Sequence, residues 1–455
     1  MNPKISWSSG LALTVVLVSV ALTACGYKTT TTYGAPTAVA LARYNANGTP
    51  DTTNLVGGTG LVTTDINPSQ DDIAFAVVRQ PADGKIIAVG TSFTTPGSVV
   101  VIRYNTDGTR DSTFGSNGIT VTSLPSADWT AFAATLQADG KLLVAGRSCA
   151  SSGVTGFLLL RYHTDISTGT PGTLDTAGFN SPLGYVVTPI PSGTKTSANT
   201  VAMSGTNILV AGHSKIGGKF AIALAQYTSS GVLDSTFGSG GIVTTAVGSL
   251  DADAAALAVQ PLDGKIVAAG LAGNAVTNVW DVALVRYNAN GSLDTTSGFG
   301  GSTGIVTTDI GSSSNYANAV ALQADGKIVV AGNAFANPSA NTSDIAVLRY
   351  NTDGTLDTTG FGSPNGYVTT SIGAFDDGFA VAVQPADGKI VVAGNADAGM
   401  GDRLALLRYN ADGSPDSGFG TGGIVTRAAS GPSIIAGAFG VVLQPGGEIV
   451  VAGYD

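Results

Sequence analysis

The chain has 455 residues, of which 43% are hydrophobic and 11% are charged, and its formal net charge at pH 7 is −10. The hydrophobic share argues against a disordered chain, because disorder requires low hydrophobicity together with high net charge. The acidic balance argues against nucleic acid as a partner, because Lys and Arg must neutralise phosphates there.

The first 24 residues have the features of an export signal. Lys4 precedes an apolar stretch over residues 11–22. This stretch is too short to span a bilayer comfortably and has the length of a signal-peptide core. It ends in Leu22-Thr-Ala-Cys25-Gly26, which resembles the lipobox of bacterial lipoproteins. The resemblance implies cleavage after residue 24, lipid attachment at Cys25 and, because Gly26 rather than Asp follows, an outer-membrane destination; the alternative is an ordinary secretory signal.

Residues 25–38 are predicted to be a lipidated N-terminus followed by a threonine-rich tether. Thr29 to Thr32 form an unbroken polar run. Such a segment would hold an anchored domain away from the membrane surface. With lipid on Cys25, the only other cysteine, Cys149, would have no intrachain disulfide partner.

From residue 39 onward one motif of about 60 residues recurs seven times. Its landmarks are an Arg-Tyr pair after an apolar run and an Asp-Gly-Lys turn. The Arg-Tyr pairs begin at Arg43, Arg103, Arg161, Arg286, Arg349 and Arg408, with Gln226-Tyr227 as the seventh copy, and the turns begin at Asp83, Asp139, Asp263, Asp325 and Asp387. Because neighbouring copies of such repeats share one apolar interior, residues 39–455 are expected to form a single domain.

Each copy is predicted to contain four antiparallel strands. In one copy these are Gly304 to Thr308, Ala317 to Gln323, Lys327 to Ala331 and Ile345 to Tyr350. They are short, rich in β-branched residues and bounded by turn residues, and Asp325-Gly326 suits a tight hairpin. Repeated four-stranded antiparallel units around a centre define a β-propeller. A parallel β-helix is disfavoured because its coils are shorter than this period.

The ends of the chain are predicted to complete the ring. The repeat opens with a lone fourth strand at residues 39–44 and stops just after a third strand at residues 448–453. Pairing these strands would bury two edges that otherwise invite aggregation. We therefore predict an all-β, seven-bladed β-propeller with four antiparallel strands per blade, whose last blade is closed by the N-terminal strand.

A recurring aromatic residue is expected to pack between adjacent blades, where one ring buries a large apolar area. It recurs at Phe114, Phe179, Phe237, Phe299, Phe361 and Phe419, with Leu55 in its place in the first copy. The copy with Gln226 departs most from the pattern, because Met203-Ser-Gly-Thr-Asn207 replaces its turn. That blade is expected to be irregular.

Together these motifs resemble the delta-60 repeat family. They are Arg-Tyr-Asn-x-Asp-Gly, Leu-Asp-x-x-Phe-Gly, Gly-Ile-Val-Thr-Thr and Gln-Pro-x-Asp-Gly-Lys-Ile-Val-Val-Ala-Gly, and they cover Val39 to Asp455. That family comprises bacterial β-propeller-like domains of unknown function. The resemblance implies the fold and export, and it carries over no catalytic residue, because none is defined.

Residues suited to catalysis or metal binding are few. His163 and His213 occur once each and lack the partners of a nucleophile relay or a zinc site, so both are interpreted as structural. The turn Asn351-x-Asp353-Gly-x-x-Asp357 and its copies carry closely spaced oxygens. Calcium uses such ligands, but the turn also forms without metal. We therefore expect no cofactor, with calcium as the alternative.

Acidic residues also cluster in the links between the first and second predicted strands of each copy. In a closed ring these links would share one face, where converging carboxylates could bind a cation or a cationic ligand. The candidate residues are Asp72, Asp128, Asp251 and Asp377. The simpler interpretation is that loops favour aspartate.

These observations favour an exported β-propeller, lipid-anchored to the cell envelope, that acts as a non-enzymatic binding or scaffold module. An envelope protein or a glycan would be its partner, and the anchor would bring it to the membrane. A propeller enzyme acting on envelope or extracellular polysaccharide and a calcium-stabilised structural protein are the alternatives. The fold alone does not decide among them.

Overall fold

The computed structural model describes residues 36–124, 126–277, 279–311, 313–337, 342–397, 401–429 and 436–455. The predicted signal peptide over residues 1–24, the lipid site at Cys25 and most of the tether lie outside the described residues. Within the described ranges, no helix has the length and apolar character needed to cross a membrane.

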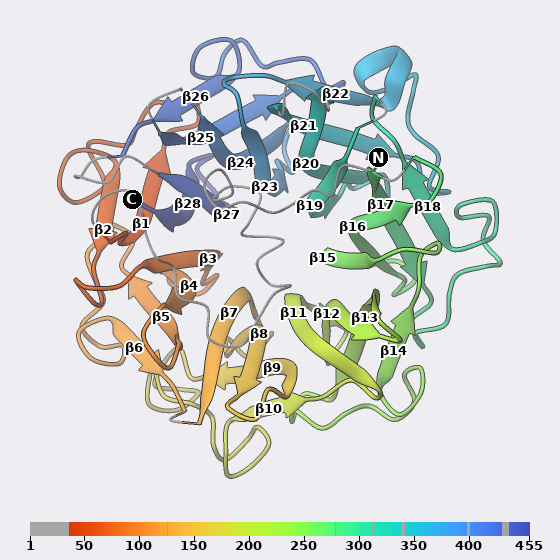
Figure 1. Cartoon of the computed structure of the whole chain (residues 1–455). Helices are drawn as coiled ribbons and strands as arrows, with labels where there is room; N and C mark the ends of the chain where they lie inside the picture. Colours follow the sequence, from red (N-terminus) through yellow and green to blue (C-terminus); the bar gives the residue numbers. More distant parts are fainter. Residues whose placement is uncertain are drawn as a thin grey trace, which may run out of the picture.

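The described strands form seven four-stranded antiparallel sheets, arranged as the blades of a ring (Figure 1). Blade 1 contains β3 (Asp72–Arg79), β4 (Ile86–Ser92), β5 (Ser98–Tyr104) and β6 (Ile119–Thr122). Blade 2 contains β7 (Ala127–Leu136), β8 (Leu142–Ala150), β9 (Thr155–Tyr162) and β10 (Tyr185–Thr188). Blade 3 contains β11 (Gly193–Ser204), β12 (Asn207–Ile216), β13 (Lys219–Tyr227) and β14 (Ile242–Thr245). Blade 4 contains β15 (Ala252–Val259), β16 (Ile266–Asn274), β17 (Val279–Tyr287) and β18 (Ile305–Thr308).

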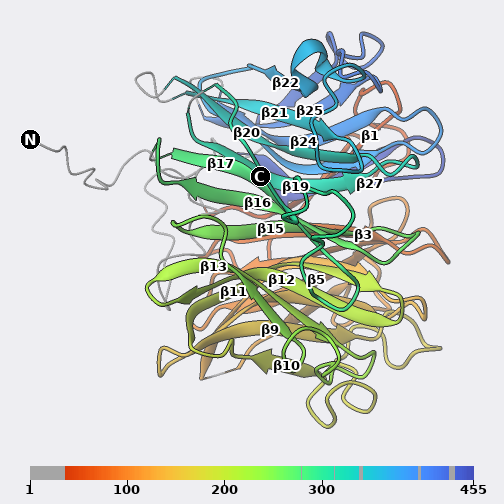
Figure 2. The same ribbon diagram turned by 90° about the vertical axis from the view of Figure 1, so that its right-hand side faces the viewer.

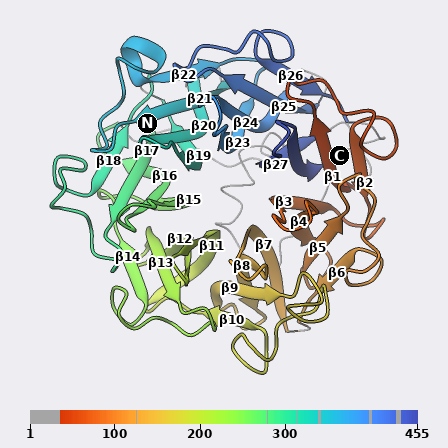
Figure 3. The ribbon, with the colours of Figure 1, turned by 180° about the vertical axis from the view of Figure 1, so that it is seen from behind.

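The remaining blades continue this order around the ring, as the views from the side and from behind also show (Figures 2 and 3). Blade 5 contains β19 (Asn315–Leu322), β20 (Ile328–Asn337), β21 (Thr342–Tyr350) and β22 (Tyr367–Thr370), with a π-helical turn, η2 (Gly362–Gly366), before β22. Blade 6 contains β23 (Asp376–Val383), β24 (Ile390–Asp397), β25 (Asp402–Tyr409) and β26 (Ile424–Arg427). Blade 7 contains β27 (Gly437–Leu443), β28 (Ile449–Tyr454), β1 (Val39–Tyr44) and β2 (Leu61–Thr64).

Blade 7 combines both ends of the chain, which confirms the predicted closure. β1 pairs antiparallel with β28, with Leu41 opposite Ala452, and with β2, with Leu41 opposite Val62. Two N-terminal strands therefore complete the blade, rather than the single strand that was expected. The phase of the repeat was wrong by one strand, because each Gly-Ile-Val-Thr-Thr segment is the outermost strand of the preceding blade.

The copy beginning at Gly304 shows the reason for this error. Its first predicted strand, β18, pairs with β17 of blade 4 and not with β19. The Arg286 amide donates to the Gly304 carbonyl, so the long loop after β17 folds back on its own blade. Loops flank β18 on both sides, and the sequence does not show which neighbour it pairs with.

The hydrophobic core consists of seven clusters, one at each interface between adjacent blades. At the interface between blade 7 and blade 1, Leu41 and Val450 of blade 7 pack with Ile86 and Tyr104 of blade 1. The recurring phenylalanines are fully buried in these clusters, as predicted, and Leu55 is 3% exposed in the first copy. Closing the ring therefore buries the same kind of surface as every other interface.

A tyrosine–threonine hydrogen bond crosses six of the seven interfaces. The tyrosine of each Arg-Tyr pair meets the last threonine of the preceding blade's outer strand, at 2.7–2.9 Å. At the seventh interface Arg427 replaces that threonine, beside Tyr44. Burial raises the pKa of Tyr44 to about 12, although the positive charge of Arg427 opposes this rise.

Candidate binding site

The blades have two chemically different ends. The Asp-Gly-Lys turns and the loops after the Arg-Tyr pairs share one end, because Ile86 pairs with Tyr104 in β4 and β5. We call this the turn end. The links that enter each inner strand and the hairpins between the second and third strands lie at the opposite end, where Asp72 pairs with Ser92. We call this the loop end.

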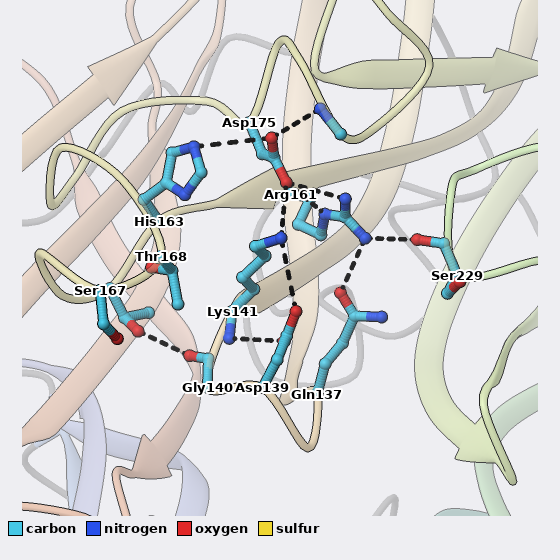
Figure 4. A network of polar contacts seen from close by, with 12 residues as sticks. Gln137, Asp139, Gly140, Lys141, Arg161, His163, Ser167, Thr168, Asp175 and Ser229 are labelled. Atoms are coloured by element: carbon cyan, nitrogen blue, oxygen red, sulfur yellow. Dashed lines mark hydrogen bonds and ion pairs between the residues drawn. The ribbon is translucent and has the colours of Figure 1, made fainter.

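The turn end contains a repeated ionic network, shown for blade 2 in Figure 4. Arg161 binds the Asp175 carboxylate through Nε at 3.0 Å and Nη2 at 2.8 Å, and Lys141 Nζ lies 3.1 Å from the same oxygen. Arg161 Nη1 also donates to the Ser229 carbonyl of blade 3. His163 Nε2 lies 3.5 Å from Asp175, so this histidine belongs to the network. The Arg161 side chain thus links two neighbouring blades.

The same Arg–Asp pair recurs in six blades, and five of them add the lysine of the Asp-Gly-Lys turn. A hydrogen bond from Lys389, supported by Arg408, lowers the pKa of Asp416 to about 2. Arg408 Nη1 donates to the Ala46 carbonyl, so this link also crosses into the blade that closes the ring. We interpret these networks as structural, because they repeat and their carboxylates are already paired.

Blade 3 keeps the aspartate but replaces the arginine and the lysine of this network with neutral amides. Asn207 Nδ2 donates to Gln226 Oε1 at 3.2 Å and to Asp234 Oδ2 at 2.8 Å. The inner pair β11–β12 has two register shifts, whereas each corresponding pair in the other blades has one. The expected irregularity of this blade is therefore confirmed.

The turns that offered calcium ligands also have protein partners. Asp353 Oδ1 accepts hydrogen bonds from the amide and the hydroxyl of Thr355, at 2.9 and 2.7 Å. Asp357 pairs with Arg349 and Lys327. In the part of the chain that the structure describes, no group of three or more His, Cys, Asp or Glu residues is arranged to hold a metal ion.

All four predicted acidic residues lie at the loop end, but three of them serve backbone amides. Asp72 is fully buried, and its Oδ2 accepts from the amides of residues 66 and 67, at 2.8 and 2.9 Å. Asp128 accepts from the Gly97 amide at 2.9 Å, and Asp251 accepts from the Phe220 amide at 2.7 Å. Asp128 and Asp251 thereby tie an inner strand to the hairpin of the preceding blade.

Asp377 of β23 shares with Asp72 a buried carboxyl in which one oxygen lacks a hydrogen-bond partner among the described residues, Oδ1 in Asp72 and Oδ2 in Asp377. Asp377 is 2% exposed. Burial, reinforced by the charges of Asp402 and Asp376, raises its pKa to about 8. Asn395 lies directly opposite on β24, is fully buried, and has neither amide atom paired within the described ranges. A buried polar group without a partner costs free energy, so this pair requires an explanation.

Sequence reasoning missed a ring of β-bulges. Every inner strand has an extra residue relative to its neighbour at the same level of the blade, and each of these seven residues is half-buried; β11 has a second extra residue nearer its start. The seven residues are Phe75, Phe132, Asn199, Ala255, Asn318, Phe379 and Phe439. The inner strands surround the centre of the ring (Figure 1), so the bulge residues belong to the strand of each blade that is nearest to that centre.

A glycine opposite each bulge permits it. A Cβ placed on the glycine that ends the Val-Val-Ala-Gly motif would lie 1.8–2.0 Å from a carbonyl oxygen of the inner strand. These glycines are Gly90, Gly146, Gly212, Gly270, Gly332, Gly394 and Gly453. The repeated glycine was therefore the available signal for the bulges, since an isolated glycine in a strand often marks one.

The bulge residues are aromatic in four neighbouring blades and small or polar in the other three. Phe379, Phe439, Phe75 and Phe132, from blades 6, 7, 1 and 2, form a continuous row with ring centroids 4.8, 5.2 and 5.4 Å apart. We call this row the aromatic arc. Blades 3, 4 and 5 contribute Asn, Ala and Asn at the same level. Between Phe439 of β27 and Phe75 of β3, the arc crosses the interface between blade 7 and blade 1.

A buried polar cluster joins blades 3 and 4 and includes the bulge residue Asn199. His213 Nδ1 lies 3.0 Å from Asp253 Oδ1, and Asn199 Nδ2 donates to that oxygen at 3.0 Å. His213 is fully buried on β12, consistent with its interpretation as a structural residue. Trp129 is also fully buried, with Nε1 donating to Ser148 Oγ at 3.1 Å, so it presents no ring on which a sugar could stack.

Comparison with known proteins gives one family. A family model described as "Domain of unknown function (DUF5122) beta-propeller" matches residues 29–53, 82–114, 137–176, 207–237, 262–296, 323–359 and 386–419. No curated protein matches the chain significantly.

Solved structures with a similar fold share few identical residues with the chain. Sqt1 from Chaetomium thermophilum is 12% identical over 82% of this chain and 75% of its own, with a TM-score of 0.40. An alpha-L-arabinofuranosidase from Fusarium graminearum is 9% identical over 74% and 93%, with a TM-score of 0.41. A family PL25 ulvan lyase is 15% identical over 78% and 83%, with a TM-score of 0.43. No functional residue is transferred from any of them.

Proposed function

The chain belongs to the DUF5122 β-propeller family, and we propose that it is a non-catalytic binding or scaffold module, exported and lipid-anchored at the cell envelope. The observation that carries this proposal is the row of four phenylalanine rings on one side of the ring of bulge residues. Repeated residues form the blade interfaces and the turn-end networks, whereas the residues that differ between blades meet at the level of the bulges.

The difference between repeated and non-repeated residues supports binding rather than structure alone. A ring that served only as a spacer could place the same small residue at all seven bulges. Instead, four phenylalanines remain half-exposed beside a fully buried core. Contiguous exposed apolar surface on a soluble domain commonly marks a place where something binds.

The envelope location is supported by the sequence alone. The segment ending at Cys25 resembles a lipobox, and the tether would let the ring face envelope partners. In the described part of the chain, Cys149 is buried and disulfide-bonded, so it is not the isolated thiol that the sequence analysis expected. The intact mass of the mature protein tests whether Cys25 carries lipid.

A pull-down tests the binding role. The purified full-length chain, immobilised in detergent, is exposed to envelope extract beside two variants. Phe439→Leu keeps apolar volume but removes one aromatic face of the arc, and Leu262→Ala changes a residue that is 95% exposed at the turn end. We expect one set of components to be retained by the wild type and Leu262→Ala and reduced by Phe439→Leu. Equal retention by all three proteins would contradict the proposal.

A glycan-degrading enzyme is the second candidate, and Asp377 is the observation that favours it. A buried carboxyl with a pKa raised to about 8 has the character of a general acid. Saturable turnover of an envelope or extracellular polysaccharide, lost in Asp377→Asn with the fold intact, would establish this function. Turnover unaffected by Asp377→Asn and by Asp128→Asn would remove the acidic face from the mechanism.

A further inference from the structure

The lysines of the described chain fall into two groups. Those of the Asp-Gly-Lys turns are each ion-paired to the aspartate of a turn-end network. All the others, Lys195, Lys215 and Lys219, belong to blade 3 and lie at its loop end, where Thr194 pairs with Lys215 and Lys215 pairs with Phe220. A chain with a formal net charge of −10 thus places every described lysine outside the networks on one blade.

The contacts of these lysines are with neutral groups. Lys195 and Lys219 are exposed, and Lys215 is half-buried. Lys219 Nζ donates to the Ser249 carbonyl, and Lys215 Nζ lies 5.6 Å from the centroid of the Phe220 ring. Neither partner carries a charge, so neither neutralises the lysine that it contacts.

The aspartates that contact blade 3 face other groups. Asp251 Oδ1 accepts from the Phe220 amide at 2.7 Å, and Asp253 Oδ1 accepts from Asn199 Nδ2 and lies 3.0 Å from His213 Nδ1. Within the described ranges, no carboxylate forms an ion pair with any of the three lysines. Blade 3 therefore presents net positive charge at the loop end.

Exposed valines flank the lysines on the two neighbouring blades. Val154 lies in the hairpin between β8 and β9 of blade 2 and is 60% exposed, and Val276 lies in the hairpin between β16 and β17 of blade 4 and is 94% exposed. The equivalent hairpin of blade 3 ends at Lys219. Because blades 2, 3 and 4 are consecutive in the ring (Figure 1), these hairpins share one side of the loop end. We call the three lysines and two valines the lysine face.

The N-terminal tether leaves the ring at the same end. The Asp72 amide donates to the Thr37 carbonyl, and the Thr37 amide donates to Asp71 Oδ1, both at 2.9 Å. Asp72 begins β3 at the loop end. With lipid on Cys25, residues 25–35 reach at most about 40 Å at 3.3–3.6 Å per residue. The proposed anchor therefore holds the loop end nearest to the membrane.

We propose that the lysine face binds anionic lipid headgroups of the membrane that holds the anchor. The lysines approach the lipid phosphates, and the two valines enter the interfacial layer. Each lysine near an anionic membrane surface contributes about fivefold in affinity, and a lipid chain combined with basic residues holds a protein more firmly than either alone. A soluble polyanion could use the same lysines, but the valines and the position of the tether favour the membrane. This inference rests on the anchor proposed above and adds the orientation of the ring.

Lysine acetylation measures the contact on the full-length chain. Protein extracted from membranes in detergent is reconstituted into vesicles of phosphatidylcholine, with or without phosphatidylglycerol, and treated briefly with acetic anhydride. Peptide mass spectrometry then gives the rate at each lysine. In the anionic vesicles we expect Lys195 and Lys219 to react at least about threefold more slowly than in the neutral ones, whereas Lys141 at the turn end reacts equally in both. Equal rates at Lys195 and Lys219 in the two vesicles would overturn the inference.

Vesicle flotation compares variants with the same change in charge. The double variant Lys195→Gln, Lys219→Gln should lower partition into anionic vesicles at least about tenfold, and the double variant Arg79→Gln, Arg110→Gln at the turn end should not. Neither should change partition into neutral vesicles. Circular dichroism and melting temperature establish that each variant is folded. Equal losses in the two double variants would show that net charge governs binding, and would contradict a specific lysine face.

A second pair of variants tests the valines. Val276→Ser should weaken binding to neutral and anionic vesicles alike, whereas Val232→Ser, at a turn-end residue that is 59% exposed, should change neither. Equal effects of Val276→Ser and Val232→Ser would remove the valines from the contact.

The partner and the anchor fail separately. Binding of soluble polygalacturonate that depends on Lys195 and Lys219, while vesicle partition does not, would overturn the membrane as the partner. A lipid-free mature mass, with vesicle partition that still depends on these lysines, would reject the anchor and keep the lysine face. Envelope capture that depends on Phe439 would support the proposed binding function in either case.

Discussion

Replacing Gly394 with alanine should break the bulge that sets the position of Phe379 on β23. The added Cβ would lie 1.8 Å from the Asp377 carbonyl oxygen and 2.9 Å from its carbon. Real Cβ atoms do not approach closer than 3.0 Å, so the two strands must separate by more than 1 Å or lose the bulge. The obstacle is backbone rather than a flexible side chain. We expect a loss of about 4 kcal/mol in the free energy of unfolding, at the upper end for single substitutions.

Gly388→Ala is the matched control in the same blade. Gly388 has φ +71° in the turn before β24, and its nearest neighbour would be the Ala411 Cβ at 3.5 Å. Only the left-handed backbone is penalised there, at about 1 kcal/mol. Urea unfolding followed by circular dichroism measures both variants. Equal losses for Gly394→Ala and Gly388→Ala would refute the argument that the glycine of each Val-Val-Ala-Gly motif exists to permit a bulge.

Three further predictions concern titration, the turn-end network and the anchor. The folded-state pKa of Asp377, about 8, exceeds the ordinary value of 3.8, so the folded protein binds more protons than the unfolded chain between these pH values and loses stability as the pH rises. The free energy of unfolding of Asp377→Asn, measured by urea titration, should therefore increase relative to that of the wild type between pH 4 and pH 9. A difference between the two proteins that stays constant with pH would contradict this. Arg349→Gln should lower the free energy of unfolding by about 3 kcal/mol, because it leaves Asp357 without its buried partner. Adding Lys327→Asn recreates the amide pair of blade 3 and should recover part of this loss in the same assay. An unchanged free energy of unfolding in the single variant would show that the Arg–Asp pair is dispensable. Intact mass of protein extracted from membranes should show loss of residues 1–24 and a lipid on Cys25, and a lipid-free mature mass would contradict the anchor.

Periodicity predicted most of the fold because it reports which residues are buried together. The Arg-Tyr pairs, the turns and the phenylalanines recur at one spacing, and each copy needs its neighbours to cover two sheet faces. The pairing partner of the outer strand escaped prediction. Residues 305–308 have loops on both sides, and only their pairing with β17 in the folded structure assigns them to the preceding blade.

The candidate site was less predictable, since a sequence shows where carboxylates lie but not what they bind. Asp72, Asp128 and Asp251 do lie at one end of the ring, as expected, yet backbone amides occupy them. The phenylalanines of the arc have no fixed position in an alternating pattern, because the bulge adds a residue and shifts the register locally. The sequence signal for the bulges was the repeated glycine on the neighbouring strand, which faces the bulged residue.

Hydrogen exchange of the native protein tests the closed ring most directly, and the arc depends on it because Phe439 and Phe75 lie on opposite sides of that closure. Amides in β1, residues 39–44, should exchange as slowly as those in β5, residues 98–104, since both are central strands buried on both faces. Exchange of β1 within seconds, while β5 stays protected, would show an N-terminal segment that is not paired with β28.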